Sequence, residues 1–80
     1  MGEDLRKRIF GIVRKYANID LTKIDPDKDF REQVSIDSIQ YVSIVARLEE
    51  ELKIELPISI MEVSTLNEFL SIVDKEFQKP

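Results

Sequence analysis

Three stretches of the chain place apolar residues at the spacing of an amphipathic helix. The expected helices run from Glu3 to Tyr16, from about Asp37 to Leu52, and onward from Thr65. Apolar residues that recur every three or four positions form one continuous stripe on a helix, and that stripe must be buried against other elements. The stripes are Leu5, Ile9, Ile12, Val13 and Tyr16; then Tyr41, Val45, Leu48 and Leu52; then Leu66, Phe69, Leu70, Val73 and Phe77.

The remaining pattern favours an all-α fold. A short turn or half-helix is expected over Ile58 to Val63, and the T-x-x-E sequence at Thr65 and Glu68 forms a capping box that starts the last helix. Apolar residues alternate between positions 54 and 60, so an edge strand is an alternative for this segment, although Pro57 interrupts the pattern. We therefore predict a single domain over residues 1–80, a small four-helix bundle with three main helices and one short helix.

A connection of about twenty residues, 17–36, separates the first two predicted helices, which is long for a compact domain. A disordered linker would be poor in apolar side chains, yet this one carries six. We expect an ordered loop that packs over one end of the bundle and leads the chain to Asp37. Its apolar residues are Ile19, Leu21, Ile24, Phe30, Val34 and Ile36.

The composition excludes several kinds of catalytic and metal site. The chain has no cysteine and no histidine, so it cannot assemble a Ser-His-Asp or Cys-His site, a thiolate zinc site or a disulfide. The consecutive carboxylates Glu49, Glu50 and Glu51 point apart on a helix and read as a solvated face. We expect no catalytic residue.

Three alternating aspartates imitate the start of a calcium-binding loop, at residues 25, 27 and 29. Such a loop needs glycine at its sixth position and glutamate at its twelfth, where this chain has Phe30 and Ile36. We therefore expect no metal site here. Instead, Asp25 should cap a short turn that Pro26 leads.

The charge is unevenly distributed along the chain. The formal net charge is −4, of which residues 1–16 contribute +3 and the remainder −7. An acidic body argues against nucleic acid as a partner, because neutralisation of phosphates dominates that affinity. No apolar run approaches 18 residues, so no membrane span is expected.

Ser38 is the chemically most informative residue. The D-x-x-Q sequence at Asp37 and Gln40 predicts a helix cap, which puts Ser38 at the first helical position. Backbone N–H groups there lack intrahelical partners, and helix N-termini bind phosphates. On this geometry alone, Ser38 is either an exposed hydroxyl suited to a phosphodiester or an ordinary serine at a helix start.

The wider context of Ser38 resembles the acyl carrier protein family, the phosphopantetheine-bearing carriers of fatty acid, polyketide and peptide synthesis. The resemblance covers nearly the whole chain, with the pieces in the family's order and spacing. These pieces are Phe30 in the long loop, Asp37-Ser38-Ile39, Val42, Leu48-Glu49-Glu50-Glu51-Leu52, Ile54-Glu55-Leu56-Pro57 and Ser64-Thr65-Leu66.

The resemblance implies a non-enzymatic carrier with 4'-phosphopantetheine attached covalently to Ser38 by a transferase that uses coenzyme A. It also implies that Asp37 assists the magnesium-dependent docking of that transferase. The thiol of the arm then holds an acyl group as a thioester, so the reactive chemistry belongs to the cofactor.

The same resemblance suggests two further sets of residues. Acyl-loading, condensing and acyl-transfer enzymes are expected to contact Ile39, Val42, Ala46, Glu49 and Glu50. A short acyl chain is expected to enter the bundle beside Val42, Ile44, Val45, Met61 and Leu66, although each of these also fits an ordinary core.

The chain departs from the family at two places near the motif. Ser35 occupies a position that is usually glycine, so the turn before Asp37 must be built differently or bear mild strain. Neutral Gln40 and Ser43 thin the acidic surface around Ser38, since position 43 is often glutamate in fatty acid carriers. Because rim charges set partner choice, we infer partners different from those of a general fatty acid carrier.

Three functions remain open at this point. The first is a free-standing, cytoplasmic, monomeric acyl carrier protein for fatty acid, polyketide or related lipid biosynthesis. The second is a carrier of the same fold that holds an aminoacyl, peptidyl or other specialised group. The third is a helical interaction domain without a prosthetic group.

Overall fold

Four α-helices and two short 3₁₀ helices make up a computed structural model that describes residues 2–79. The α-helices are α1 (Glu3–Ala17), α2 (Phe30–Val34), α3 (Ser38–Leu52) and α4 (Leu66–Phe77). The 3₁₀ helices are η1 (Leu21–Lys23) and η2 (Ile58–Glu62). The predicted all-α class is confirmed.

Helix α1 has the predicted bounds to within one residue, and Asn18 ends it in the left-handed conformation. Four residues of its apolar stripe are buried, but Tyr16 is 39% exposed, so the expectation that it belongs to the core is wrong. Its ring instead packs beside cations at the surface, with the Arg47 guanidinium 4.7 Å from the ring centroid. An amphipathic ring at a helix end can keep such a half-exposed position.

The long connection is ordered and packed, as predicted, but it is more than a loop. It contains η1 and α2, and α2 was missed because it spans only five residues. Asp29 starts α2 by accepting a hydrogen bond from the Glu32 N–H at 3.0 Å. Of the six apolar residues, Leu21 and Phe30 are buried and the other four are half-buried.

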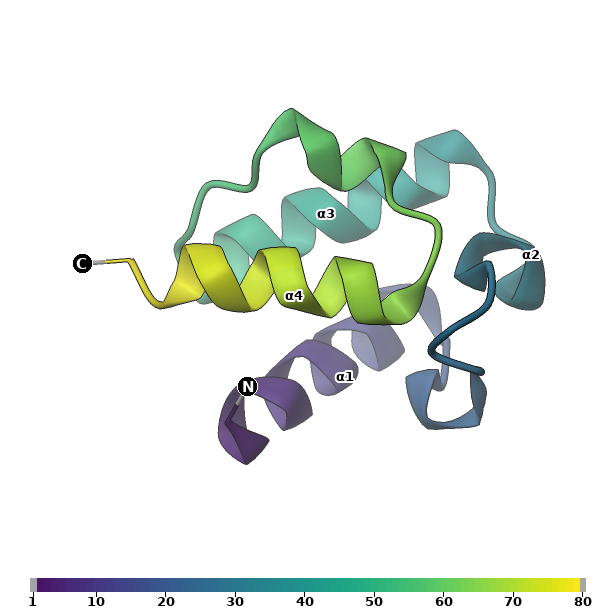
Figure 1. The fold of residues 1–80 in the computed structure, drawn as a ribbon, viewed down its shortest axis with the longest axis horizontal. Coiled ribbons are helices and arrows are strands. Elements are labelled where there is room, and N and C mark those ends of the chain that lie inside the picture. The colour runs from purple at the N-terminus through teal and green to yellow at the C-terminus, as the bar shows by residue number, and fades with distance from the viewer. Residues whose placement is uncertain (1, 80) are drawn as a thin grey trace.

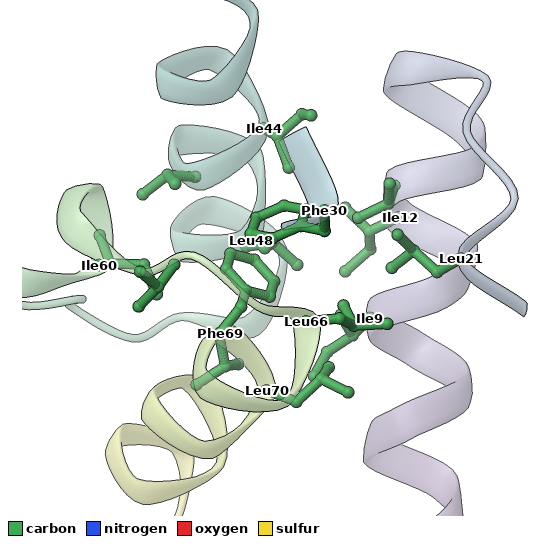
Figure 2. Packing of buried hydrophobic residues seen from close by; sticks show 14 of the residues in the cluster. Ile9, Ile12, Leu21, Phe30, Ile44, Leu48, Ile60, Leu66, Phe69 and Leu70 are labelled. Carbon is green, nitrogen blue, oxygen red and sulfur yellow. The ribbon is translucent and has the colours of Figure 1, made fainter. Parts of the chain in front are cut away.

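Phe30 joins the connection to the rest of the core. Its ring centroid lies 5.8 Å from that of Tyr41 on α3 and 5.6 Å from that of Phe69 on α4. These separations are favourable for tilted aromatic pairs. Its backbone N–H also donates to the Ser64 carbonyl at 2.9 Å. Figure 2 shows Phe30 and Phe69 close together at the centre of the buried cluster.

The segment before α4 forms a 3₁₀ helix, so the alternative of an edge strand is wrong. Within residues 2–79 the strand-like pairing is limited to one isolated bridge between Asp29 and Thr65. The short helix expected over 58–63 is therefore η2, while the short α-helix of the bundle is α2. The predicted capping box of α4 is confirmed, with the Thr65 N–H donating to Glu68 Oε1 at 3.0 Å.

The helices surround one apolar core. Figure 1 shows α2 and η1 together at one end of the bundle, beside the start of α3, with the end of α4 at the opposite end. Helices α1, α3 and α4 direct Ile9, Leu48 and Leu66 into the same buried cluster. Among residues 2–79, every helix is too short or too polar to cross a bilayer.

Candidate functional site at the start of helix α3

The first turn of α3 is held by a reciprocal cap. Asp37 Oδ1 accepts a hydrogen bond from the Gln40 N–H at 2.8 Å, and Gln40 Oε1 accepts one from the Asp37 N–H at 3.1 Å. The predicted cap is confirmed. One oxygen of the exposed Asp37 carboxylate is thereby held in place, and the carboxylate remains open to solvent.

Ser38 is the first residue of α3 and is exposed. Its position brings its side chain to the positive end of a 15-residue helix, next to N–H groups that have no intrahelical acceptor. Within residues 2–79 no hydrogen bond ties down its hydroxyl group. A modifying protein can therefore approach this oxygen, and a phosphodiester formed on it would be electrostatically favoured.

Ser35 ends α2 in the left-handed conformation, with φ of 54° and ψ of 48°. The turn before Asp37 is thus built with positive φ although a serine occupies the position. The sequence left two alternatives, a turn of different geometry or a turn with mild strain. The structure has the second, because the backbone crowds the Cβ atom of Ser35 in this conformation.

The five expected partner-contacting residues fall into two groups. Ile39, Val42, Ala46 and Glu50 are exposed, and Ile39 and Val42 are 78% and 50% exposed. Glu49 differs, because it is half-buried and its Oε2 accepts a hydrogen bond from the Leu56 N–H at 2.9 Å. Glu49 is therefore not part of the solvated face that was expected for Glu49, Glu50 and Glu51. Its carboxylate instead holds the loop after α3.

The five expected pocket residues do not line one cavity. Ile44 and Leu66 border a narrow apolar recess of about 10 Å³, which has room for at most one water molecule. Val45 is buried in the core, Met61 is half-buried, and Val42 is half-exposed on the outer side of α3.

The comparisons with known proteins decide the family. Residues 7–73 match the family model described as "Phosphopantetheine attachment site". The chain belongs to the acyl carrier protein family. Proteins of this family are carriers and not enzymes, and they hold phosphopantetheine covalently on a serine.

Three relatives show how far this similarity extends. The carrier is 26% identical over 74 residues to an acyl carrier protein of Picosynechococcus, and the match covers 91% of both chains. It is 30% and 32% identical to the mitochondrial acyl carrier proteins 2 and 3 of Arabidopsis thaliana, over 68% and 70% of its own length. It spans 43% and 44% of these two plant proteins.

Two polar side chains that sequence reasoning did not assign to the site hold η2 in this carrier. The buried Tyr41 hydroxyl donates a hydrogen bond to the Ile60 carbonyl, and the Arg31 guanidinium donates one to the Met61 carbonyl. The Arg31 guanidinium also lies 3.9 Å from the centroid of the Tyr41 ring. The hydroxyl of Tyr41 on an apolar stripe was the available signal, since a buried tyrosine needs a hydrogen-bond partner.

We expect Tyr41 to make the stability of this carrier sensitive to alkaline pH. Burial raises the pKa of Tyr41 to about 12, although the Arg31 charge opposes this rise. The ordinary pKa of tyrosine is about 10, so the folded state favours the neutral Tyr41 hydroxyl more than the unfolded state does. The stability that this preference contributes is complete below pH 10 and is lost as pH rises to 12. The free energy of unfolding should fall by roughly 2–3 kcal/mol across this window, at about 1.4 kcal/mol per pKa unit.

Chemical denaturation at pH 9 and pH 11.5 measures this loss. Tyr41→Phe should show a correspondingly smaller drop between the two pH values. Tyr16→Phe, which alters a partly exposed tyrosine, should retain the drop of the unsubstituted chain. Equal drops in Tyr41→Phe and Tyr16→Phe would contradict the assignment.

Replacing Ser35 by glycine should stabilise the carrier. Glycine adopts positive φ without the penalty of roughly 1–2 kcal/mol that other residues bear, but it costs about 0.5–1 kcal/mol in unfolded-state entropy. The expected net gain is about 0.5–1 kcal/mol, measured by urea denaturation. Ser35→Ala keeps the Cβ atom and should show no such gain, so an equal gain in both variants would refute the strain at this turn.

Proposed function

We propose that this protein is an acyl carrier protein in which Ser38 bears the 4'-phosphopantetheine arm. The thiol of the arm would carry acyl intermediates as thioesters in fatty acid, polyketide or related lipid biosynthesis. The observation that carries this proposal is the exposed Ser38 hydroxyl on the first residue of α3, inside the matched range 7–73.

The local residues suit the attachment reaction. A phosphopantetheinyl transferase would join Ser38 Oγ to the pantetheine-bearing phosphate of coenzyme A. The pyrophosphate P–O bond breaks, adenosine 3',5'-bisphosphate leaves, and the hydroxyl proton passes to a base of the transferase or to solvent. The positive end of α3 favours the anionic phosphodiester that results. The exposed Asp37 carboxylate lies next to this hydroxyl in the sequence and provides an oxygen ligand of the kind that Mg²⁺ prefers. Asp37 is therefore proposed to assist docking of the transferase and its magnesium.

The surface around Ser38 suggests which enzymes the carrier meets. Acyl-loading, condensing and acyl-transfer enzymes are proposed to contact the exposed residues Ile39, Val42, Ala46 and Glu50, which lie along α3. Gln40 and Ser43 leave the first turns of α3 without acidic side chains. This neutral surface also favours a second candidate, a carrier of aminoacyl, peptidyl or other specialised groups.

The proposed working form is a cytoplasmic monomer. The absence of cysteine is compatible with a reducing compartment.

Mass spectrometry tests the proposed function directly. The purified chain is incubated with coenzyme A, Mg²⁺ and a phosphopantetheinyl transferase of broad specificity. The expected product is heavier by one phosphopantetheine group, on every molecule. No mass gain under conditions that fully load a control carrier protein would overturn the proposal and favour an interaction domain without a prosthetic group.

A further inference from the structure

We propose that the outer face of α1 is a second docking surface, on which an acidic α-helix of a partner protein lies across Gly11. The inference goes beyond the proposed function and does not depend on the arm at Ser38. The surface belongs to residues 7–15, where two adjacent cations stand at each end of the stretch and a glycine stands at its centre. We call it the α1 cation face, and its charged members are Lys7, Arg8, Arg14 and Lys15.

Helical spacing places the four cations around Gly11. They stand three and four positions before and after it, and residues at these separations are neighbours on a helix surface. Lys7 and Arg14 are two turns apart, about 10.5 Å along the axis, and so are Arg8 and Lys15. Two short rows of positive charge therefore flank the glycine. All five residues are exposed, and Figure 1 shows α1 along one side of the bundle.

The packing of the protein does not require a glycine in the middle of α1. Gly11 has no positive φ, and a Cβ atom placed on it would contact no other element of the protein. Glycine is a poorer residue than alanine inside a helix, so its presence here lowers the stability of α1. What glycine provides is bare backbone that a partner can approach closely. The open space above Gly11 is thus suited to a contact with another molecule.

The cations of this face are largely without acidic partners. Within residues 2–79, only Arg14 among the four has a carboxylate within 4.0 Å, since its Nη1 atom lies 3.4 Å from Asp20 Oδ2. Arg8 donates to the Glu51 backbone carbonyl at 3.3 Å, which leaves its charge unneutralised. The Lys15 ammonium lies over an aromatic ring, 5.1 Å from the centroid. The face therefore presents positive charge on a protein whose net charge is −4.

Charge and shape favour an acidic helix over other anionic partners. A helix is a convex rod, so it can fill the space above Gly11 and set acidic side chains two turns apart against both rows of cations. A membrane surface is flat, and the apolar stripe of α1 is buried in the core and cannot insert. Nucleic acid carries phosphates along its whole length, which the net charge of −7 on the rest of the chain would repel.

The α1 cation face leaves the region around Ser38 free. Gly11 is six residues, about 9 Å, before Ala17, which is the end of α1 that shares a surface hollow with Ile39. The residues proposed to contact acyl-processing enzymes all belong to α3. A partner helix on α1 would therefore hold the protein while an enzyme acts at Ser38.

Titration of the ¹⁵N-labelled chain with a designed helix tests this docking. The probe is an alanine-rich helical peptide of about twenty residues, with two adjacent glutamates on each side of a central alanine at the spacing of residues 7–15. Backbone amide shifts should appear across this stretch, saturate, and weaken as salt is raised. A peptide with glutamine in place of glutamate should cause none. No shifts on α1 with the glutamate peptide, or equal shifts with the glutamine peptide, would overturn the inference.

Two further probes distinguish the other anionic partners. Vesicles that contain phosphatidylserine and a short DNA duplex should each bind the chain more weakly than the glutamate peptide at the same salt concentration. Tighter binding of either one would overturn the acidic helix as the occupant and assign the α1 cation face to a lipid surface or to nucleic acid.

Matched variants separate the effect of the open space from that of the charges. Gly11→Leu fills the space but keeps all four cations, and it should weaken binding of the glutamate peptide severalfold. Lys7→Gln combined with Lys15→Gln removes two charges and should weaken it by roughly threefold to thirtyfold. Ser71→Leu and Lys75→Gln, at exposed positions of α4, should bind the peptide like the unsubstituted chain.

Thermal unfolding shows that a loss of binding is not a loss of structure. Gly11→Leu should melt no lower than the unsubstituted chain, because leucine favours a helix more than glycine does. Undiminished peptide binding by Gly11→Leu would overturn the position of the partner helix, and undiminished binding by the double charge variant would overturn the role of the cations. Phosphopantetheine loading is measured separately by mass and tests only the proposed function.

Discussion

Ser38→Ala is expected to abolish phosphopantetheine loading completely, with no gain of mass under conditions that load the unsubstituted chain. The substitution removes the oxygen that would form the phosphodiester. No neighbouring group can replace it, because the closest side chains on the same turn are the carboxylate of Asp37, the alkyl group of Ile39 and the amide of Gln40. Intact-mass spectrometry shows whether the added mass of one phosphopantetheine group is present or absent.

Two controls distinguish lost chemistry from lost structure. Ser38 is exposed and the cap of α3 belongs to Asp37, so Ser38→Ala should change the free energy of unfolding by less than about 0.5 kcal/mol. Ser71→Ala removes another exposed serine hydroxyl, on α4, and should load normally. Full loading of Ser38→Ala would show that the arm is attached elsewhere.

Phe30→Ala is expected to produce the largest loss of stability among the substitutions considered. The ring is 5% exposed and lies against Tyr41 and Phe69, so its removal leaves a cavity where α2, α3 and α4 meet. Deleting a buried phenylalanine ring costs about 3–5 kcal/mol, against a total of about 5–15 kcal/mol for a typical domain. The melting temperature should fall by about 4–8 °C per kcal/mol.

Phe10→Ala is the matched control for this loss, because Phe10 is a half-buried phenylalanine on α1 at the edge of the same core. Its replacement should cost distinctly less than that of Phe30. Thermal unfolding followed by circular dichroism compares the two. A melting temperature of Phe30→Ala equal to that of the unsubstituted chain would show that the connection between α1 and α3 is not docked through Phe30.

Local signals in the sequence were sufficient for the main helices and for the start of α3. The apolar periodicity of α1, α3 and α4 and the capping boxes at Asp37 and Thr65 depend on residues within a turn or two of each other. Such features can be inferred from neighbours in the chain alone. The position and exposure of Ser38 followed from the same local pattern.

Other features depend on residues that are distant in the sequence. Helix α2 is too short to show periodicity, and its position is set by contacts such as the one from the Phe30 N–H to Ser64. Glu49 read as a solvated glutamate because its partner, the Leu56 N–H, lies seven residues further on, beyond the end of the helix. Tyr16 was assigned to the core because periodicity does not reveal that its ring packs against the cation of Arg47, which is distant in the sequence.

The amino-acid order alone therefore determined the three long helices, the capping boxes of α3 and α4, and the exposed serine at the start of α3. Only the tertiary structure decided how much space is left inside the bundle, since the size of a cavity depends on how side chains from several elements pack together. The same packing places the Arg47 guanidinium of α3 against the Tyr16 ring of α1, a contact between two helices that are separated in the chain by the whole connection.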